Sequence, residues 1–332
     1  MNLRVKCLLI INCLMVVICA TKAQCPNADF ILSKKSICID EKLVLNNAST
    51  SFDSISWDFC SGDNLNKLPN SNELDGDFGA TNYSKFITDK NEKYSFVTGF
   101  VSDKLYRLDF GNSILNVPIF NDLGDLGVLD DPMGIVLKKE MNKWYAIVAG
   151  YNNNLYRLEF GESLKNTPNP VDISGTLNLN RPMGVEMVMD EGNIFVFVVN
   201  NANSTYPLLR LNFGNSILNT PTVDEITIPG SRQLSTLSFG RSCDQWYGFI
   251  VSRATREIFR MDFGDSPSNN PVITEVGGSS GLLFNDPGGI DVVSEANKNY
   301  VFVTSRNGPL YRLDFGDSFL NNPTGRDLGN IN

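Results

Sequence analysis

The hydrophobic positions of this chain fall into short runs that recur at regular distances along most of its length. Within one repeat, an apolar run follows a proline, as at Asp131–Ile135, and a second run is almost wholly apolar, as at Trp144–Val148. A third run has the form Leu-Tyr-Arg-Leu-Asp-Phe-Gly, and a fourth follows another proline, as at Pro168. Short runs rich in Val, Ile and aromatic residues predict strands, so each repeat predicts four strands.

The third run sets the period of the repeat. Its copies lie at Leu105–Gly111, Leu155–Gly161, Leu208–Gly214, Ile258–Gly264 and Leu310–Gly316. The phenylalanines of successive copies are 50, 53, 50 and 52 residues apart. Four strands in about 50 residues are typical of a β-propeller blade. Trp57-Asp58-Phe59 aligns with Leu108-Asp109-Phe110 at a similar distance, so the sequence predicts an all-β propeller of about six four-stranded blades.

The first residues predict export rather than a fold. Arg4 and Lys6 precede an apolar run at Cys7–Cys19, and Thr21–Ala23 has the small residues of a cleavage site. This pattern is typical of a secretory signal peptide over residues 1–23, cleaved near Ala23, and the run is too short for a membrane span. We expect residues 24–78 to form an N-terminal segment that serves as the first blade, and residues 79–332 to form five further repeats. The protein is expected to be secreted or displayed on the cell surface.

Two resemblances extend this interpretation. Cys25–Phe30, Ser36–Leu43 and Ser54–Phe59 resemble the first half of a PKD domain, an immunoglobulin-like sandwich of secreted bacterial proteins. The repeat with its Gly-Asn-Ser-x-x-Asn-x-Pro turn is similar to the propeller part of large surface proteins from gliding bacteria. Kelch, NHL and YVTN propellers are related in architecture, although their signature motifs are not found here. The resemblance implies a surface or adhesion role.

Four cysteines would survive signal cleavage, and their even number makes disulfides plausible in an oxidising compartment. Cys38 and Cys60 are the first candidates because they lie close in the chain. A bond from Cys25 or Cys60 to Cys243 is an alternative, and free buried thiols are another.

Composition excludes several kinds of chemistry. The chain has no histidine, which excludes histidine-based catalysis and histidine-bound metals. Removal of residues 1–23 leaves 25 basic and 37 acidic residues, a net charge of −12. Nucleic acids and anionic membranes are bound by clustered Lys and Arg, so neither is an expected partner. No cofactor and no dedicated metal site are expected, because the acidic turns, such as Asp130-Asp131, lack the spacing of a calcium loop.

Each third strand except Leu208–Gly214 carries opposite charges two residues apart, as in Arg107/Asp109 and Arg157/Glu159. Side chains two residues apart share a face of a strand. We expect these charges to form ion pairs between blades, and the phenylalanines to pack between blades.

The loops on one face of the propeller differ from repeat to repeat, whereas the turns on the other face are nearly identical. Repeats retain what the scaffold needs and diversify where ligands bind. The predicted ligand-binding residues on the variable face are Tyr151, Asn152, Asn153, Asn201, Asn203, Tyr206, Arg253, Arg256, Arg306 and Asn307. Plain surface loops are an equally good explanation.

The sequence favours a non-enzymatic propeller that binds a glycan or a protein through this face. One alternative is a polysaccharide hydrolase or lyase, which needs two carboxyl groups and no histidine. Its candidate residues are Asp131, Asp286 and Asp291, which lie near the first strands. Another alternative is a structural spacer of a larger adhesin.

Overall fold

The computed structural model describes residues 30–32, 45–47, 81–202, 206–295, 298–306 and 308–330. The chain divides into two units, Met1–Gly62 and Asp63–Asn332. In the first unit, β1 (Phe30–Leu32) and β2 (Leu45–Asn47) form an antiparallel pair. The predicted signal peptide and the candidate cysteines Cys25, Cys38 and Cys60 lie outside the described residues. Cys243 lies among them and is disulfide-bonded.

The second unit is a β-propeller whose described residues form five antiparallel sheets of four strands. Each sheet is a blade in which the strands follow one another in chain order. The strands, blade by blade, are β3 (Thr81–Asp89), β4 (Glu92–Gly99), β5 (Lys104–Gly111) and β6 (Ile119–Asp122); β7 (Pro132–Glu140), β8 (Lys143–Gly150), β9 (Asn154–Gly161) and β10 (Asn169–Asp172); β11 (Pro182–Asp190), β12 (Asn193–Asn200), β13 (Leu208–Asn212) and β14 (Thr222–Ile226); β15 (Leu234–Ser242), β16 (Gln245–Ser252), β17 (Glu257–Gly264) and β18 (Val272–Glu275); β19 (Pro287–Glu295), β20 (Lys298–Ser305), β21 (Pro309–Gly316) and β22 (Thr324–Asn330).

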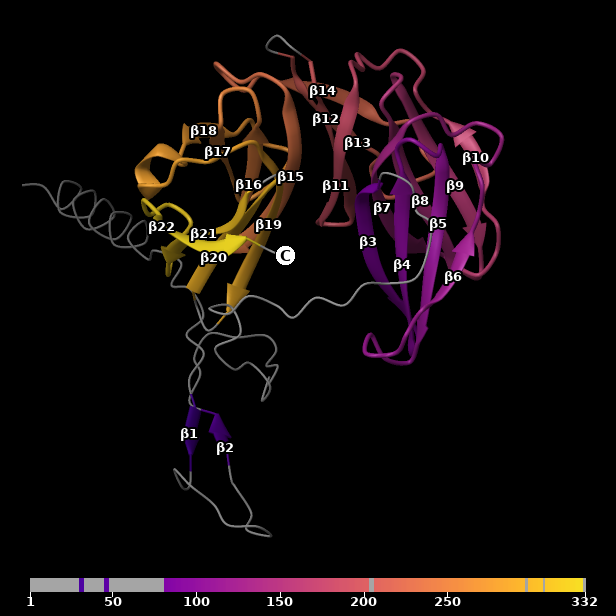
Figure 1. Cartoon of the computed structure of the whole chain (residues 1–332), viewed down its shortest axis with the longest axis horizontal. Coiled ribbons are helices and arrows are strands. Elements are labelled where there is room, and N and C mark those ends of the chain that lie inside the picture. The colour runs from indigo at the N-terminus through magenta and orange to yellow at the C-terminus, as the bar shows by residue number, and fades with distance from the viewer. Residues whose placement is uncertain are drawn as a thin grey trace, which may run out of the picture. The chain divides into compact units, whose positions relative to one another are not determined.

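The blades surround a central channel. Figure 1 shows the first strands β3, β7, β11, β15 and β19 nearest to the common centre. Each first strand packs against the first strand of the next blade, from β3 to β19. A 3-10 turn, η2 (Gly278–Ser280), lies in the connection between the fourth and fifth blades. Within the described part of the chain, no helix is long and apolar enough to cross a membrane.

The prediction of about six blades is wrong, because the described residues build five. The third strand of each blade is one of the five copies of the repeated motif, and the blade also needs the two strands before it. The predicted sixth copy ends at Phe59. The described strands before it, β1 and β2, pair with each other in a separate two-stranded sheet. Trp57-Asp58-Phe59 matches the motif at only two positions, Asp58 and Phe59, and serine precedes it where the other copies have arginine, so the match is too short to define a blade.

Hydrophobic side chains from neighbouring blades form the core. Four of the five motif phenylalanines lie in clusters that join two blades. Phe160, for example, stacks edge-on against Phe96 of the preceding blade with a 5.1 Å separation of ring centroids. This confirms that the phenylalanines pack between blades. The exception is Phe110 of the first blade, whose cluster contains residues of that blade alone.

The nearly identical turns after the third strands have a common hydrogen-bond pattern. In the first blade, Gly111 has a φ of +65°, which glycine adopts without strain, and Asn116 Nδ2 donates to the Phe110 carbonyl at 2.8 Å. The same side-chain bond from asparagine recurs in every other described blade. The conserved spacing of glycine and asparagine within this chain therefore serves the scaffold.

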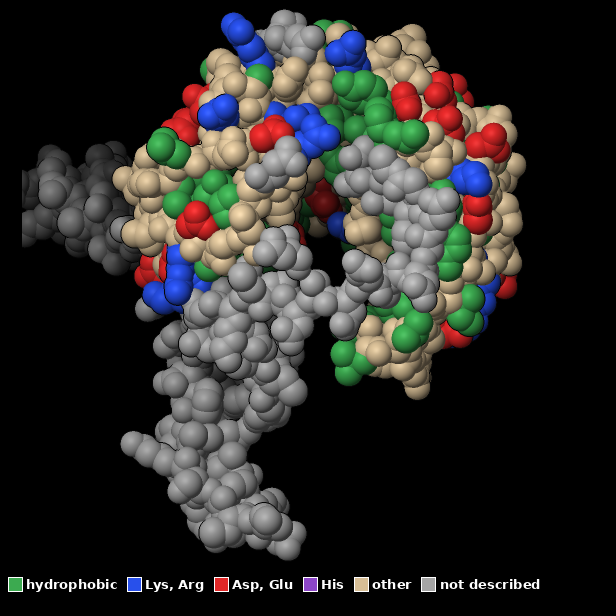
Figure 2. All heavy atoms as spheres, in the orientation of Figure 1, with side chains coloured by type: hydrophobic (Ala, Val, Ile, Leu, Met, Phe, Trp, Pro, Cys, Tyr) green, Lys and Arg blue, Asp and Glu red, His purple; other side chains and the backbone are tan. Residues whose placement is uncertain are grey.

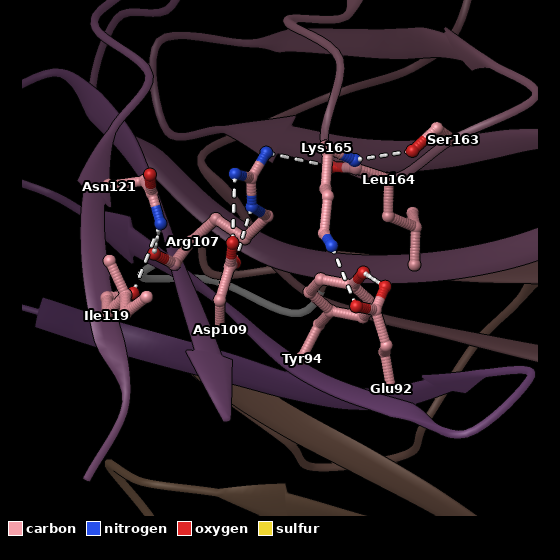
Figure 3. Close-up of polar contacts among 9 residues, drawn as sticks. All are labelled: Glu92, Tyr94, Arg107, Asp109, Ile119, Asn121, Ser163, Leu164 and Lys165. Carbon is pink, nitrogen blue, oxygen red and sulfur yellow. Dashed lines mark hydrogen bonds and ion pairs between the residues drawn. The ribbon is translucent and has the colours of Figure 1, made fainter. Parts of the chain in front are cut away.

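The motif arginines connect each blade to the next. Arg107 Nε and Nη2 donate to Asp109 at 2.6 and 3.1 Å, while Nη1 donates to the Leu164 carbonyl of the second blade at 2.9 Å (Figure 3). The equivalent bonds to the next blade run from Arg157 to the Ile217 carbonyl, from Arg210 to the Pro267 carbonyl and from Arg260 to the Phe319 carbonyl. The prediction of ion pairs between blades is therefore wrong. In the first two blades the ion pair lies within one strand, and the bond between blades goes to a backbone carbonyl.

Candidate functional site

One end of the channel carries a cavity of about 580 Å³, which we call the mouth cavity. At this end lie the loops between second and third strands and the connections between blades. The residue that directly follows the second strand of each blade lines the cavity. We call these five residues the mouth ring: Phe100, Tyr151, Asn201, Arg253 and Arg306.

A backbone hydrogen bond places the mouth ring in four of the blades. The residue just before each of these first strands has a positive φ, between 45° and 52°, at Asp131, Arg181, Gln233 and Asp286. Its carbonyl accepts the backbone N–H of the mouth-ring residue in the same blade at 3.0–3.1 Å. The scaffold therefore holds one equivalent position per blade at the rim of the channel, while the side chain at that position is free to vary.

The mouth ring has an aromatic part and a basic part. Phe100 and Tyr151 lie in neighbouring blades, with ring centroids 5.7 Å apart and planes nearly perpendicular. Arg181 lies over the Tyr151 ring at 5.7 Å. On the other side, Arg253 Nε and Nη2 donate to Asp286 Oδ1 at 3.1 and 3.0 Å. The Arg306 side chain is exposed, and no Asp or Glu is among the described residues that line the cavity.

Hydrogen bonds across blades fix the floor of the cavity. The Tyr83 hydroxyl of β3 donates to the Ser235 carbonyl of β15 at 3.1 Å, which links the first blade to the fourth. Asn201 Nδ2 donates to the Leu234 carbonyl at 2.7 Å. Burial raises the pKa of Tyr83 far above its ordinary value, so its hydroxyl keeps the proton that this bond needs. The cavity is therefore preformed.

A second cavity of about 360 Å³, which we call the channel cavity, lies in the channel. It shares the lining residues Tyr83, Thr236 and Gly289 with the first cavity. Strand register places one residue of each blade at the same level: Lys85, Val136, Glu186, Ser238 and Asp291. Four of these five side chains are polar or charged. Figure 2 shows both acidic and basic atoms in the hollow at the centre of the ring.

Glu186 and Asp291 are the two carboxyl groups of this level. Lys85 Nζ lies 3.2 Å from Glu186 Oε1, and Ser238 Oγ donates to Asp291 Oδ1 at 3.1 Å. Burial raises the pKa of Glu186; the ion pair with Lys85 opposes this change, and the negative charge of Asp291 adds to it. Glu186 therefore holds its proton to a higher pH than an ordinary glutamate.

The three aspartates expected from the sequence to serve an enzyme occupy different surroundings. Asp131 precedes β7 and accepts a hydrogen bond from Asn152. Asp286 precedes β19 and is neutralised by Arg253. Of the three, Asp291 is the one that lines the channel cavity.

Asp131 also belongs to an acidic cluster with Asp103 and Asp130, whose carboxylate oxygens lie within 4.8 Å of one another. Burial, followed by the charges of Asp103 and Asp130, raises the pKa of Asp131. The cluster lies on exposed turns, and its Asp103 Oδ1 already accepts the Asp131 backbone N–H at 2.8 Å. Such clusters are common on surfaces and do not define a metal site by themselves.

The predicted ligand-binding residues are divided by the structure. Tyr151, Asn201, Arg253 and Arg306 line the mouth cavity. The others that are described have local partners or lie outside the lining: Asn152 donates to Asp131, Asn153 accepts from the Arg181 backbone, Tyr206 donates to Asn178, and Arg256 is exposed. Asn203 and Asn307 lie outside the described residues.

Sequence reasoning missed Phe100, Lys85 and Glu186. Phe100 directly follows a second strand, as the other mouth-ring residues do, but the variable-face residues predicted from the sequence begin in the second blade. Glu186 carried a signal, since it is the one charged residue in the apolar segment Met183–Met189. A carboxyl at the centre of a buried strand is costly unless it has a partner or a function.

The fold and this site define a five-bladed β-propeller with an open cavity at one end of its channel. No protein-family model and no curated protein matches the chain. Among solved structures, a thermostable family-43 glycoside hydrolase is similar at a TM-score of 0.50 and 10% identity, covering 76% of this chain and 95% of the other. An α-L-arabinofuranosidase from Clostridium thermocellum gives 0.48 and 12%, covering 76% and 94%. A quinonprotein alcohol dehydrogenase-like protein from Bacteroides thetaiotaomicron gives 0.42 and 15%, covering 71% and 51%. At these identities the likeness concerns the fold alone, and the first of these structures, at a TM-score of 0.50, supports the β-propeller.

Proposed function

We propose that this protein is a glycoside hydrolase that holds a sugar chain at the mouth ring and cleaves it at Glu186 and Asp291. The observation that carries the proposal is the pair of carboxyl groups at one level of the channel. Both line a cavity that adjoins the cavity at the mouth ring and shares three lining residues with it. The sequence had favoured a non-enzymatic protein, and the structural neighbours do not support that preference.

The chemistry requires two carboxyl groups with different proton affinities. One carboxylic acid protonates the leaving oxygen, and the second carboxylate activates water or attacks the sugar. Glu186, whose pKa is raised by burial, suits the acid. Asp291 accepts a hydrogen bond from Ser238, which orients it for the role of the carboxylate. Lys85 holds the Glu186 side chain in place.

A second candidate is glycan binding without cleavage. It is favoured by the mouth cavity, where aromatic and arginine side chains occur without any lining carboxyl among the described residues. Both candidates share the sugar ligand and differ only in what happens in the channel. In both, the proposed location is outside the cell, following export by the predicted signal peptide.

The test is release of reducing sugar from a panel of polysaccharides by residues 24–332. Glu186→Gln should lower kcat at least about a hundredfold and leave substrate affinity nearly unchanged, since it removes only the proton donor. Glu162→Gln, at an exposed turn, is the matched control and should behave as the unmodified protein. Binding without any cleavage would favour the second candidate. Full activity in Glu186→Gln would refute the assignment of the acid.

A further inference from the structure

We infer that the mouth ring selects a sugar that carries a carboxylate, a uronic acid unit of an oligosaccharide. This inference rests on the proposed glycan ligand and adds its chemical class. Its basis is the division of the ring into an aromatic part and a basic part. The five positions are structurally equivalent, so the difference between these parts is a property of the side chains and not of the fold.

The basic part is unusual for this molecule. The chain as a whole has a net charge of −9, yet the lining of the mouth cavity contains Arg253 and Arg306 and, among its described residues, no Asp or Glu. Asp286 neutralises Arg253 at 3.0 Å. Arg306 has no ion pair within the described part of the chain, and its side chain is exposed. The cavity therefore has a net positive charge in an acidic protein and attracts an anion.

Guanidinium groups fit carboxylates especially well. The planar guanidinium presents parallel N–H donors that match the two oxygens of a carboxylate. Ser305 lies beside Arg306 in the cavity lining, and its buried hydroxyl has no hydrogen-bond partner among the described residues. Buried polar atoms are normally paired, so this hydroxyl is a polar group beside Arg306 that still lacks a partner. Arg306 forms the proposed carboxylate position.

The aromatic part suits the remainder of the sugar. Phe100 and Tyr151 present apolar surface to the cavity, and Val101 beside them is 68% exposed. A pyranose ring has C–H groups that pack on aromatic side chains, while its hydroxyls need polar partners. Asn201 lies between the aromatic and basic parts in blade order. A uronate thus places its ring on Phe100 and Tyr151 and its carboxylate on Arg306.

The experiment measures binding of matched acidic and neutral oligosaccharides by calorimetry. The acidic probes are oligogalacturonate, oligoguluronate, oligomannuronate and glucuronoxylan fragments, and the neutral probes are galactan, mannan and unsubstituted xylan fragments of the same lengths. We expect the tightest binding from an acidic probe, with affinity that falls as salt rises. Preference for neutral probes would overturn the inference and leave the proposed glycan ligand intact. No binding by any probe would overturn both.

Variants then locate the carboxylate. Arg306→Gln should weaken binding of the acidic probe at least about tenfold, the size expected for losing a charge-assisted hydrogen bond, and change neutral binding little. Arg306→Lys should retain part of the preference because the charge remains. Arg241→Gln, in the hairpin at the opposite end of the channel, is the control. Equal loss for acidic and neutral probes in Arg306→Gln would contradict the assignment, with thermal unfolding used to check that the variant is folded.

Discussion

At the scale of single residues, the channel concentrates charge where a propeller could have been apolar. Lys85, Glu186 and Asp291 occupy equivalent positions, and the second blade has Val136 there. Valine shows that the scaffold accepts an apolar side chain at this level. The charged groups therefore are not required for the fold, and their close approach suits chemistry better than stability.

Lys85→Met should move the basic limb of the pH–activity profile to higher pH. Lys85 lowers the pKa of Glu186, so its removal raises that pKa, and the acid remains protonated at a higher pH. Measurement of kcat over pH would show the shift. Lys143→Met, an exposed lysine at the start of β8, is the control. A limb that stays in place would mean that Glu186 is not the titrating acid.

At the scale of elements, two kinds of polar contact join the first blade to the second (Figure 3). Arg107 is 6% exposed and has partners in its own strand and in the next blade. Lys165 and Glu92 form an ion pair of 2.7 Å, with both side chains about half exposed. Buried and exposed polar contacts contribute differently to the free energy of unfolding, because water competes only for the exposed contact.

Arg107→Gln should therefore destabilise the propeller by about 3 kcal/mol, because it leaves the Asp109 carboxylate and the Leu164 carbonyl without their donor. Lys165→Gln should cost less than about 1 kcal/mol. Thermal and denaturant unfolding would compare the two. Equal effects from both substitutions would show that the arginine contact does not join the blades energetically.

At the scale of the whole molecule, the ring depends on contacts spread over all its blades, including tyrosines in the first, second and fourth. Burial raises the pKa of Tyr83, Tyr94, Tyr156 and Tyr247 above the ordinary value. In the unfolded chain these phenols lose their protons near pH 10. The folded protein then binds more protons than the unfolded chain, so its stability decreases as pH rises.

The propeller should thus lose stability progressively above about pH 10, with its full tyrosine contribution present below that value. Chemical denaturation from pH 8 to 11 would measure the decline. Tyr83→Phe should have a shallower decline, because one of the groups that titrate on unfolding is gone. It should also be less stable at neutral pH, since the Ser235 carbonyl loses its hydrogen bond. An unchanged slope would contradict the buried, protonated state of Tyr83.

The sequence by itself determined the strands, their order and the division between constant and variable ends. Periodic apolar runs and the glycine–asparagine turns carry that information locally, within each repeat. It also pointed to Tyr151, Asn201, Arg253 and Arg306, because equivalent loop positions can be aligned along the chain.

Only the tertiary structure decided the number of blades, the completion of the mouth ring by Phe100, and the level that joins Lys85 to Glu186 and Asp291. Lys85 and Glu186 are 101 residues apart, and no local pattern relates them. They meet because five twisted sheets pack face to face and turn their first strands toward one axis. That geometry arises from the packing between blades. A sequence repeat describes one blade and carries no information on how one blade packs against another.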